Sequence, residues 1–413
     1  MSQARPTPKH APMDQFAVEG NELLVGNIPL SRLSVRAGGT PFFAYDRQLL
    51  DRRVSELRAA LPECIEVHYA IKSNPMPALV QFLAGRVDGL DVASARELSI
   101  ALDAGCPAQG ISFAGPGKSR GELEQAVAAG VLINVESLRE VQTLADISSA
   151  TGWPARIALR VNPDFELKSS GMRMGGGAKQ FGVDAEAVPA LLAEVGRLGL
   201  SFEGFHIFAG SQNLRAEAIV AAQRLSFDLA VRLSADAPVL PRILNLGGGF
   251  GIPYFPGDSR LDLAPIGENL ADLAEETTHK LPGAKLAVEL GRYLVGEAGI
   301  YVCRVVDRKI SRGQTFLVCD GGLHHHLAAS GNFGQVLRKN FPVAIGNRMD
   351  APVGDPVNIV GPLCTPLDLL ADRMPLPEAE PGDLVVVFQS GAYGATASPQ
   401  AFLGHPAPRE ILV

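Results

Sequence analysis

The chain has 413 residues, which is more than one ordinary core requires and enough for two domains. Its residues are 46% apolar and 20% charged, as in globular proteins, and its net charge of −7 offers no basic face for nucleic acid. No apolar run reaches the roughly 20 residues of a membrane span. The polar, Pro-rich segment Met1–Phe16 lacks the apolar region of a signal peptide, and five scattered cysteines without a CxxC motif indicate a reducing cytoplasm.

A regular alternation of short apolar runs and longer helical segments begins near residue 50. The eight predicted strands are Glu66–Ile71, Gly89–Ala93, Ile111–Ala114, Leu132–Val135, Arg156–Val161, Phe202–Phe208, Ile243–Leu246 and Lys285–Leu290. The predicted helices between or after them are Met76–Leu83, Ala95–Ala104, Arg120–Ala129, Leu138–Ser149, Ala185–Leu198, Ala216–Leu233 and Ile266–Lys280. Eight such units in about 230 residues predict a (β/α)8 barrel, with a doubly wound open sheet as the alternative.

The pattern changes after Gly299, where β-type runs are separated by turns and prolines. These runs are Ile300–Val306, Thr315–Cys319, Val357–Val360 and Leu384–Phe388, and two earlier runs, Glu22–Val25 and Phe42–Tyr45, are of the same kind. We therefore expect a C-terminal all-β domain that also includes N-terminal strands. The expected organisation is a loose arm over residues 1–20, strands of the β domain over 21–45, the barrel over 46–298 and the β domain over 299–413.

Lys72 directly follows the first predicted barrel strand, and Asn74-Pro75 breaks that strand. A lysine at the end of an apolar strand is costly unless its charge is used or suppressed, although it can also snorkel to the surface. A partly desolvated lysine amine can form a Schiff base with a carbonyl compound. Catalytic groups of such barrels lie at the C-terminal ends of the strands, where Lys72 stands.

Three other features stand at predicted strand ends. The run Gly247–Gly251 follows the seventh strand, which is a recurrent phosphate position in barrels, although tight turns also use glycine. Glu289 closes the eighth strand and either pairs with an arginine or holds a proton on a pyridine nitrogen. His206, on the sixth strand, is either a core histidine or stacks on a flat ring. Together with Lys72, these groups meet the needs of pyridoxal 5′-phosphate (PLP).

From about residue 40 to the C-terminus the chain resembles the ornithine/diaminopimelate/arginine decarboxylase family of PLP enzymes, whose barrel is related to that of alanine racemase. The motifs that carry the resemblance are Tyr69-Ala70-Ile71-Lys72, Asp91-Val92-Ala93-Ser94, His206 with Gly210-Ser211-Gln212, Gly247–Gly251, Glu289-Leu290-Gly291-Arg292, Gly361-Pro362-Leu363-Cys364 and Gly391-Ala392-Tyr393-Gly394.

The resemblance implies a role for each matching residue. Lys72 binds PLP covalently, His206 stacks on its ring, Glu289 pairs with the ring nitrogen, and Cys364, from a partner subunit, returns a proton to the substrate carbon. The implied cofactor contacts are Lys72, Asp91, Arg160, His206, Ser211, Gly247, Gly248, Gly249, Glu289, Gly291, Arg292 and Tyr393, and the implied substrate contacts are Arg292, Thr365, Asp368 and Tyr393. The family forms homodimers with shared active sites. We expect no metal site, since consecutive histidines in an extended His324-His325-His326 point to opposite faces.

Departures from the family pattern bear on the substrate. Leu290 replaces the usual proline, and the spacing from His206 to Ser211 is longer than usual. The glutamate and arginine with which diaminopimelate decarboxylases hold the distal end of their substrate have no counterparts at Thr365 and Leu327–Ser330. We therefore expect an α-decarboxylase acting on a modified or carrier-bound amino acid, similar to the exosortase-associated and carrier-protein-type subgroup. Its alternatives are diaminopimelate decarboxylase, a racemase, which Glu289 and Cys364 disfavour, and a non-catalytic PLP-binding protein, which the β domain disfavours.

Overall fold

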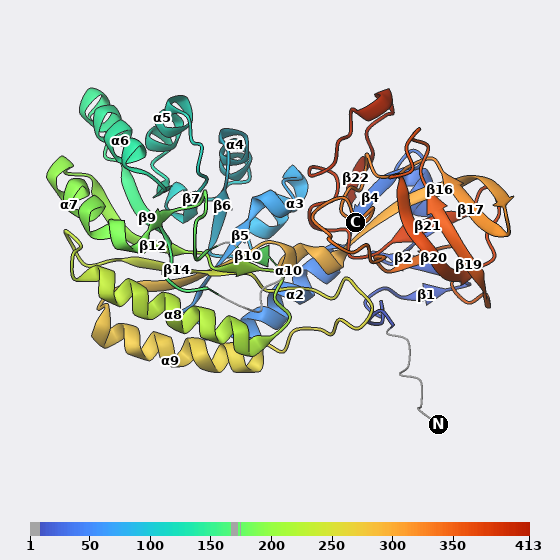
Figure 1. The fold of residues 1–413 in the computed structure, drawn as a ribbon, viewed down its shortest axis with the longest axis horizontal. Coiled ribbons are helices and arrows are strands. Elements are labelled where there is room, and N and C mark those ends of the chain that lie inside the picture. The colour runs from blue at the N-terminus through green and yellow to red at the C-terminus, as the bar shows by residue number, and fades with distance from the viewer. Residues whose placement is uncertain (1–8, 167–171, 174) are drawn as a thin grey trace. The chain divides into compact units, whose positions relative to one another are not determined.

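The computed structural model of the protein describes residues 9–166, 172–173 and 175–413 (Figure 1). Its contacts divide the chain into two compact units. The first, which we call the barrel unit, comprises Arg53–Gly251 and Leu261–Tyr293. The second, the β unit, comprises the described residues up to Arg52 together with Ile252–Arg260 and Leu294–Val413.

The barrel unit contains a closed ring of eight parallel strands. In ring order these are β5 (Glu66–Ala70), β6 (Gly89–Val92), β7 (Ile111–Phe113), β8 (Leu132–Val135), β9 (Arg156–Asn162), β12 (Ser201–Ile207), β14 (Ile243–Gly248) and β15 (Lys285–Leu290). The pairing of β15 with β5 and of β8 with β9 leaves no open edge in this ring. The predicted (β/α)8 barrel is therefore confirmed, and the open doubly wound sheet is excluded. A short strand, β11 (Val183–Asp184), runs parallel to β9.

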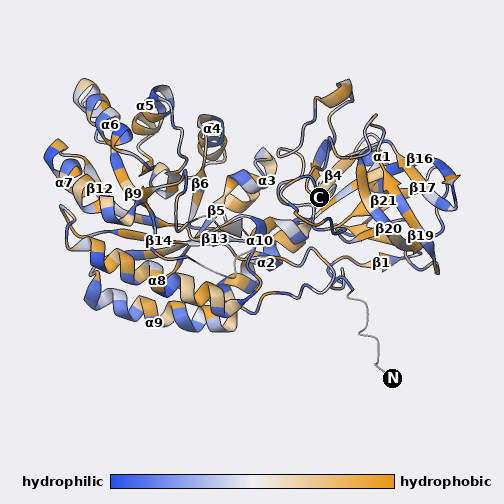
Figure 2. Cartoon of the chain, in the orientation of Figure 1, coloured by the Kyte–Doolittle hydropathy of each residue, from blue (hydrophilic) through white to orange (hydrophobic). Residues whose placement is uncertain are grey.

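Helix α2 (Arg47–Ala60) precedes the first barrel strand, and further helices follow the strands. These are α3 (Pro77–Ala84), α4 (Ala95–Asp103), α5 (Arg120–Ala129), α6 (Leu138–Thr151), α7 (Val188–Leu198), α8 (Ala216–Ser234), α9 (Ala264–Lys280) and α10 (Arg292–Val295). Figure 2 shows hydrophobic and hydrophilic residues side by side on α8 and α9, as expected for helices with one face on the sheet. Within the described residues, none of the helices combines the length and the apolar character that crossing a bilayer requires.

Three consecutive helices of the barrel unit begin with the same local signal. Ser94, Ser119 and Ser137 stand at the N-caps of α4, α5 and α6, and each side chain accepts a hydrogen bond from the backbone amide three residues later. The acceptor satisfies one of the unpaired amides at a helix start, which is worth about 1 kcal/mol per cap. These caps fix where each helix begins and so where the preceding strand–helix loop, which carries the polar residues, must end.

The β unit is built around an eight-stranded sheet. Its central path runs β18 (Val343–Ile345), β21 (Leu384–Val387), β16 (Gly299–Ser311), β17 (Gln314–Cys319), β19 (Val353–Val360) and β20 (Leu369–Pro377). The early strand β4 (Phe42–Tyr45) pairs with β16 and with the C-terminal strand β22 (Arg409–Leu412). The prediction that an N-terminal strand joins the C-terminal β domain is thus confirmed.

The other early segment forms a small sheet of its own. Strands β1 (Val18–Glu19), β2 (Glu22–Val25) and β3 (Ile28–Pro29) pair antiparallel, and α1 (Leu30–Arg36) follows them. A hydrogen bond of 2.8 Å from the amide of Leu23 to the carbonyl of Gly346 ties this sheet to the segment after β18. Two further short strands, β10 (Met172–Arg173) and β13 (Gly210–Ser211), pair with each other in the barrel unit.

Candidate active site

Lys72 lies in a short 3₁₀ turn, Ile71–Ser73, that directly follows β5. The hydroxyl of Ser73 donates a 2.9 Å hydrogen bond to the carbonyl of Ala70, which closes the turn onto the end of the strand. The lysine therefore leaves the barrel at its C-terminal end, where barrel enzymes place their chemistry. Its side chain is 43% exposed, so the amine can be reached by other molecules.

A buried carboxylate and imidazole stand beside the lysine amine. Lys72 Nζ lies 3.2 Å from Glu289 Oε1, and His206 Nε2 lies 2.9 Å from Glu289 Oε2. Because an ionised carboxylate can only accept, the Nε2–H of His206 is the donor. The ring of Phe208 also lies near the amine, 5.4 Å from its centroid to Nζ. The structure thus brings together three of the predicted site residues, although they are separated by up to 217 positions in the chain.

Glu289 is held ionised by its neighbours. Burial alone would raise the pKa of this carboxyl, but Lys72, His206 and Arg160 outweigh burial and hold the pKa well below its usual value. A carboxyl with a lowered folded-state pKa stabilises the fold above its unfolded pKa of 4.5, and that contribution is lost as the pH falls toward the folded-state value. Glu289 therefore keeps its negative charge at neutral pH.

Arg160 is fixed by a residue that is not among the predicted site residues. Its guanidinium lies 3.0 Å from Glu136 Oε1, and both side chains are buried. Glu136 also accepts hydrogen bonds from the amides of Gly115 (2.7 Å) and Gly182 (2.9 Å). Burial would raise the pKa of Glu136, but Arg160 and these amides lower it. The signal that could have identified Glu136 is its place directly after a barrel strand.

The glycine turn after β14 runs against the backbone of its neighbours. Gly247 and Gly249 have positive φ angles of 69° and 77°. A Cβ on Gly248 would lie 2.0 Å from the carbonyl oxygen of Glu289, and a Cβ on Gly249 would lie 2.1 Å from that of Gly210. Only glycine fits these positions. The turn therefore packs bare backbone against the main chain of Glu289 and Gly210, and a backbone without side chains is what a phosphate-binding turn also requires.

Three other predicted cofactor contacts lie at the same end of the barrel. A Cβ on Gly291 would lie 2.9 Å from the Cβ of Ser73, so Gly291 adjoins the turn that carries Lys72. Arg292 follows it and begins α10, and Ser211 lies in β13. These placements leave their contacts with PLP as predictions.

Asp91 faces a different set of neighbours. Its carboxylate accepts a hydrogen bond from Ser112 Oγ and lies 3.5 Å from His68 Nδ1, in the barrel interior. It is 5% exposed. The structure therefore joins Asp91 to polar residues of β5 and β7, and its contact with the cofactor stays a prediction.

In the β unit, Cys364 lies on a loop that is fixed by Asp368. The thiol is exposed, whereas Asp368 is 3% exposed. The two oxygens of Asp368 accept hydrogen bonds from the amides of Leu323 (2.6 Å) and Leu363 (2.8 Å). Because both oxygens are engaged by the backbone, the geometry favours a role in holding the Cys364 loop over the predicted contact with substrate.

Two further predicted residues of the β unit are placed by their own neighbours. Thr365 Oγ1 accepts a hydrogen bond of 3.3 Å from the amide of Leu367, within the same loop as Cys364. Tyr393, at a positive φ of 54°, stacks on Phe333 with ring centroids 6.3 Å apart. Both keep their assignments as predictions.

The three consecutive histidines pack inside the β unit. His325 is 3.1 Å from the hydroxyl of Tyr301, and His326 is 2.9 Å from that of Ser390. Burial lowers the pKa of His326 to about 3 and, with the neighbouring His325, that of His324 to about 4. They are therefore neutral packing residues at neutral pH. No group of three or more His, Cys, Asp or Glu within the described parts of the chain has the arrangement of a metal site.

The barrel site fits a cofactor with an aldehyde, a ring nitrogen and a phosphate. Lys72 provides an accessible amine and Glu289 a buried negative charge. His206 is 2% exposed, and its Nδ1 has no hydrogen-bond partner among the described residues, so one edge of the imidazole is left for another molecule. The glycine turn completes the set with backbone that carries no side chains, directly beside the main chain of Glu289. These are the groups that PLP requires.

Residues 47–296 match the family model described as "Pyridoxal-dependent decarboxylase, pyridoxal binding domain". The match covers the barrel and includes every residue of the site described above from Lys72 to Glu289.

Known relatives extend the similarity over nearly the whole chain. The chain is 38% identical to L-glutamyl-[BtrI acyl-carrier protein] decarboxylase of Niallia circulans, over 90% of this chain and 88% of the relative. It is 32% identical to diaminopimelate decarboxylase of Aquifex aeolicus, over 95% and 90% of the two chains. Among solved structures, diaminopimelate decarboxylase of Helicobacter pylori in complex with L-lysine matches with a TM-score of 0.80 and 26% identity, over 93% of this chain and 94% of that chain.

Proposed function

The chain belongs to the pyridoxal-dependent decarboxylase family, and we propose that it decarboxylates an amino acid joined to an acyl carrier protein. The family makes the enzyme a carboxy-lyase with PLP as its cofactor. The observation that carries the reaction type is the contact of an accessible lysine amine with a buried, ionised carboxylate at the C-terminal end of the barrel.

Each residue of the barrel site has a defined task. When bound, PLP supplies an electron sink for the pair that the departing carboxyl group leaves on the substrate. The amine of Lys72 would hold the cofactor and give way to the amine of the substrate. Glu289, ionised and 2.9 Å from His206, would hold a proton on the ring nitrogen, and His206 would limit how the ring can move. Gly247–Gly249 would surround the phosphate.

Two observations support a carrier-bound substrate: the name of one relative, and the residues that the chain has for contact with the distal end of a substrate. The Niallia circulans relative acts, by its name, on glutamate joined to a carrier protein. A free diaminopimelate would bring a second carboxylate and ammonium, and burying both requires charged partners. The segments Gly321–Asn332 and Gly361–Leu369, which include the predicted substrate side of the β unit, contain no arginine and no glutamate.

The test is a comparison of kcat/KM for glutamate and other amino acids joined to an acyl carrier protein, for the same free amino acids and for free diaminopimelate. We expect at least about a 100-fold preference for a carrier-bound amino acid, because two segments without arginine or glutamate gain little from the distal charges of free diaminopimelate. Turnover of free diaminopimelate at about 10⁴ M⁻¹s⁻¹ or above would instead identify a diaminopimelate decarboxylase.

The proposal includes a homodimer in which Cys364 acts as the proton donor of a shared site. Its support is an apolar surface of the β unit near the Cys364 loop. Leu367 on that loop is 59% exposed, and Val336 and Leu337 are 99% and 78% exposed. Asn332, which lies between the histidine segment and these residues, donates to the carbonyl of Leu367, so the two segments are neighbours. Exposed apolar side chains grouped in this way are typical of a protein–protein interface.

The shared site predicts complementation between two inactive variants. Lys72→Ala and Cys364→Ala homodimers, mixed and allowed to exchange subunits, should regain about a quarter of the wild-type activity, because half of the dimers are then mixed and one of their two sites is intact. Activity and mass by light scattering are measured together. The Cys64→Ala variant, with another exposed thiol, is the control and should be active alone. An active wild-type monomer, or mixtures that stay inactive although mixed dimers form, would contradict the shared site.

We also place the enzyme in the cytoplasm. The support is the cysteine usage of the chain, since five scattered cysteines without a CxxC motif are typical of a protein from a reducing compartment.

A further inference from the structure

The barrel has a second opening at the end opposite to Lys72. An open cavity of about 1010 Å³ lies where the strands begin, and its lining includes the first residues of β5, β7, β8, β9, β14 and β15. In barrel enzymes the chemistry is at the other end, and the N-terminal end contributes to stability. A cavity of this size is in the range of small-molecule sites, and the decarboxylation assigned above makes no use of it.

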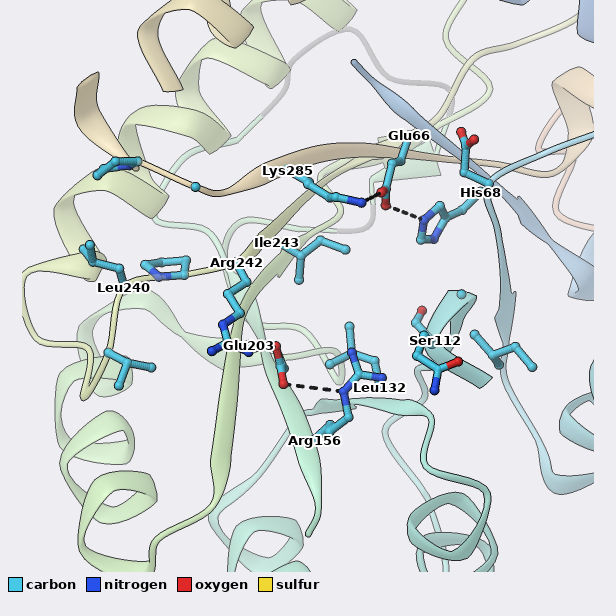
Figure 3. Close-up of a pocket in the computed structure, with 18 residues that line it drawn as sticks. Glu66, His68, Ser112, Leu132, Arg156, Glu203, Leu240, Arg242, Ile243 and Lys285 are labelled. Atoms are coloured by element: carbon cyan, nitrogen blue, oxygen red, sulfur yellow. Dashed lines mark hydrogen bonds and ion pairs between the residues drawn. The ribbon is translucent and has the colours of Figure 1, made fainter. Parts of the chain in front are cut away.

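Several charged side chains of this opening share a carboxylate with a neighbouring cation. Glu66 lies between Lys285 and His68 (Figure 3). Its carboxylate is 2.6 Å from Lys285 Nζ and 3.5 Å from His68 Nε2. Burial alone would lower the pKa of His68, but the carboxylates of Asp91 and Glu66 outweigh it and raise the pKa to about 10, so His68 is a cation. The carboxylate of Glu66 therefore contacts two cations, and His68 has Asp91, 3.5 Å from its Nδ1, as a second carboxylate partner.

A second carboxylate is shared in the same way. Glu203 lies 3.4 Å from Arg156, and Arg242 is only within 3.9 Å of it, which is beyond hydrogen-bond distance (Figure 3). Asp88, also in the lining, is engaged by Arg58 and by the amide of Val67. Arg242 is 77% exposed and Lys285 is 69% exposed, so both can turn toward an incoming anion.

Apolar side chains stand next to these cations. Val239 and Leu240, in the segment that leads into β14, are 54% and 56% exposed, and they line the cavity together with Ile243. Figure 3 shows Leu240 on the same side of the opening as Arg242. A solvated cluster of ion pairs does not by itself explain why Val239 and Leu240 are exposed beside it. An apolar wall beside two exposed cations, one of which lies beyond hydrogen-bond distance of its carboxylate, is the lining expected for a ligand that has both kinds of group.

We propose that the N-terminal opening of the barrel binds a small organic anion with an apolar body. Arg242 and Lys285 hold the anionic group, and Val239 and Leu240 contact the apolar body. A bidentate contact from the guanidinium suits a carboxylate, sulfonate or phosphate. The site is separate from the decarboxylation site, and its residues lie entirely in the barrel unit.

The test uses the enzyme with its cofactor and two fluorescent probes that differ by one group. The first is 1-anilinonaphthalene-8-sulfonate, and the second is N-phenyl-1-naphthylamine, which has the same ring system without the sulfonate. We expect saturable binding of the sulfonate, at least about tenfold tighter than that of the neutral probe, because tenfold corresponds to one well-made charged contact. Arg242→Glu should remove this difference, and Leu240→Asp should weaken both probes by about tenfold.

Both substitutions are at exposed positions, so the fold and the decarboxylase activity should be kept. Matched controls are Arg120→Glu on α5, where the arginine is 55% exposed, and Leu138→Asp on α6, where the leucine is 49% exposed. The controls should bind both probes as the wild type does. The proposal is overturned if the sulfonate does not bind saturably, if it binds no tighter than the neutral probe, or if Arg242→Glu and Leu240→Asp bind both probes as the controls do.

Discussion

Replacing Lys72 by alanine is expected to abolish both decarboxylation and the covalent attachment of PLP. The amine is the accessible nucleophile beside Glu289, and both holding the cofactor and releasing the product require it. The measurements are CO₂ release, the visible absorbance of the bound cofactor, and the mass of the protein after borohydride reduction, which fixes a Schiff base. Wild type should gain the mass of the reduced cofactor, and the variant should not.

A lysine of equal exposure provides the control for this substitution. The side chain of Lys280, on α9, is 44% exposed and pairs with Glu276 on the helix surface. Lys280→Ala should bind PLP and turn over substrate as the wild type does. Since Glu289 still has His206 as a partner when Lys72 is removed, the variant should also remain folded, and its circular dichroism spectrum can confirm this. A Lys72→Ala protein that is coloured and active would remove Lys72 from the mechanism.

The barrel could be predicted from the sequence because its elements are local. Each strand is a short apolar run that is buried on both faces, and each is followed by a segment with helical periodicity, so the period and the length of the runs suffice. The β unit was harder to predict. Strand β20 contains Pro375, Pro377 and two charged residues, which disfavour a strand in isolation. It forms because β19 supplies its pairing partner from another part of the chain.

The site shows the same division between local and distant signals. Lys72, His206 and Glu289 could be selected because each of them stands in or directly after an apolar strand. A polar side chain there has a desolvation cost that a functional role would explain. The sequence places Glu136 after a barrel strand without giving it a role, and the resemblance assigns Asp368 to the substrate and not to the Cys364 loop, since both roles are defined by the groups that the side chains contact. A guanidinium from strand β9 and two amides from other loops converge on Glu136, and two loops distant in sequence meet at Asp368. No spacing within the sequence encodes such a convergence.

Replacing Glu289 by glutamine should lower kcat by about two to three orders of magnitude while PLP stays attached to Lys72. Glutamine keeps the size of the side chain, and its carbonyl oxygen can still accept from His206. The substitution removes a carboxylate that Lys72, His206 and Arg160 keep ionised. The neutral amide of glutamine cannot stabilise a proton on the ring nitrogen. Loss of one preorganised electrostatic contact in a buried site has an effect of this size.

The pH dependence separates an electrostatic role of Glu289 from a structural one. The carboxyl has a lowered pKa, so in the wild type it carries its charge at every pH from about 5 upward, and no pH in this range can supply that charge to the glutamine variant. The variant should therefore be slow over the whole range, and Glu289→Asp should recover part of the rate. Glu203→Gln, at a carboxylate of similar burial (7% against 5% exposed) at the opposite end of the barrel, should keep kcat within about twofold. If Glu289→Gln and Glu203→Gln have equal rates, the charge of Glu289 does not drive the reaction, and the electron sink is maintained by another group.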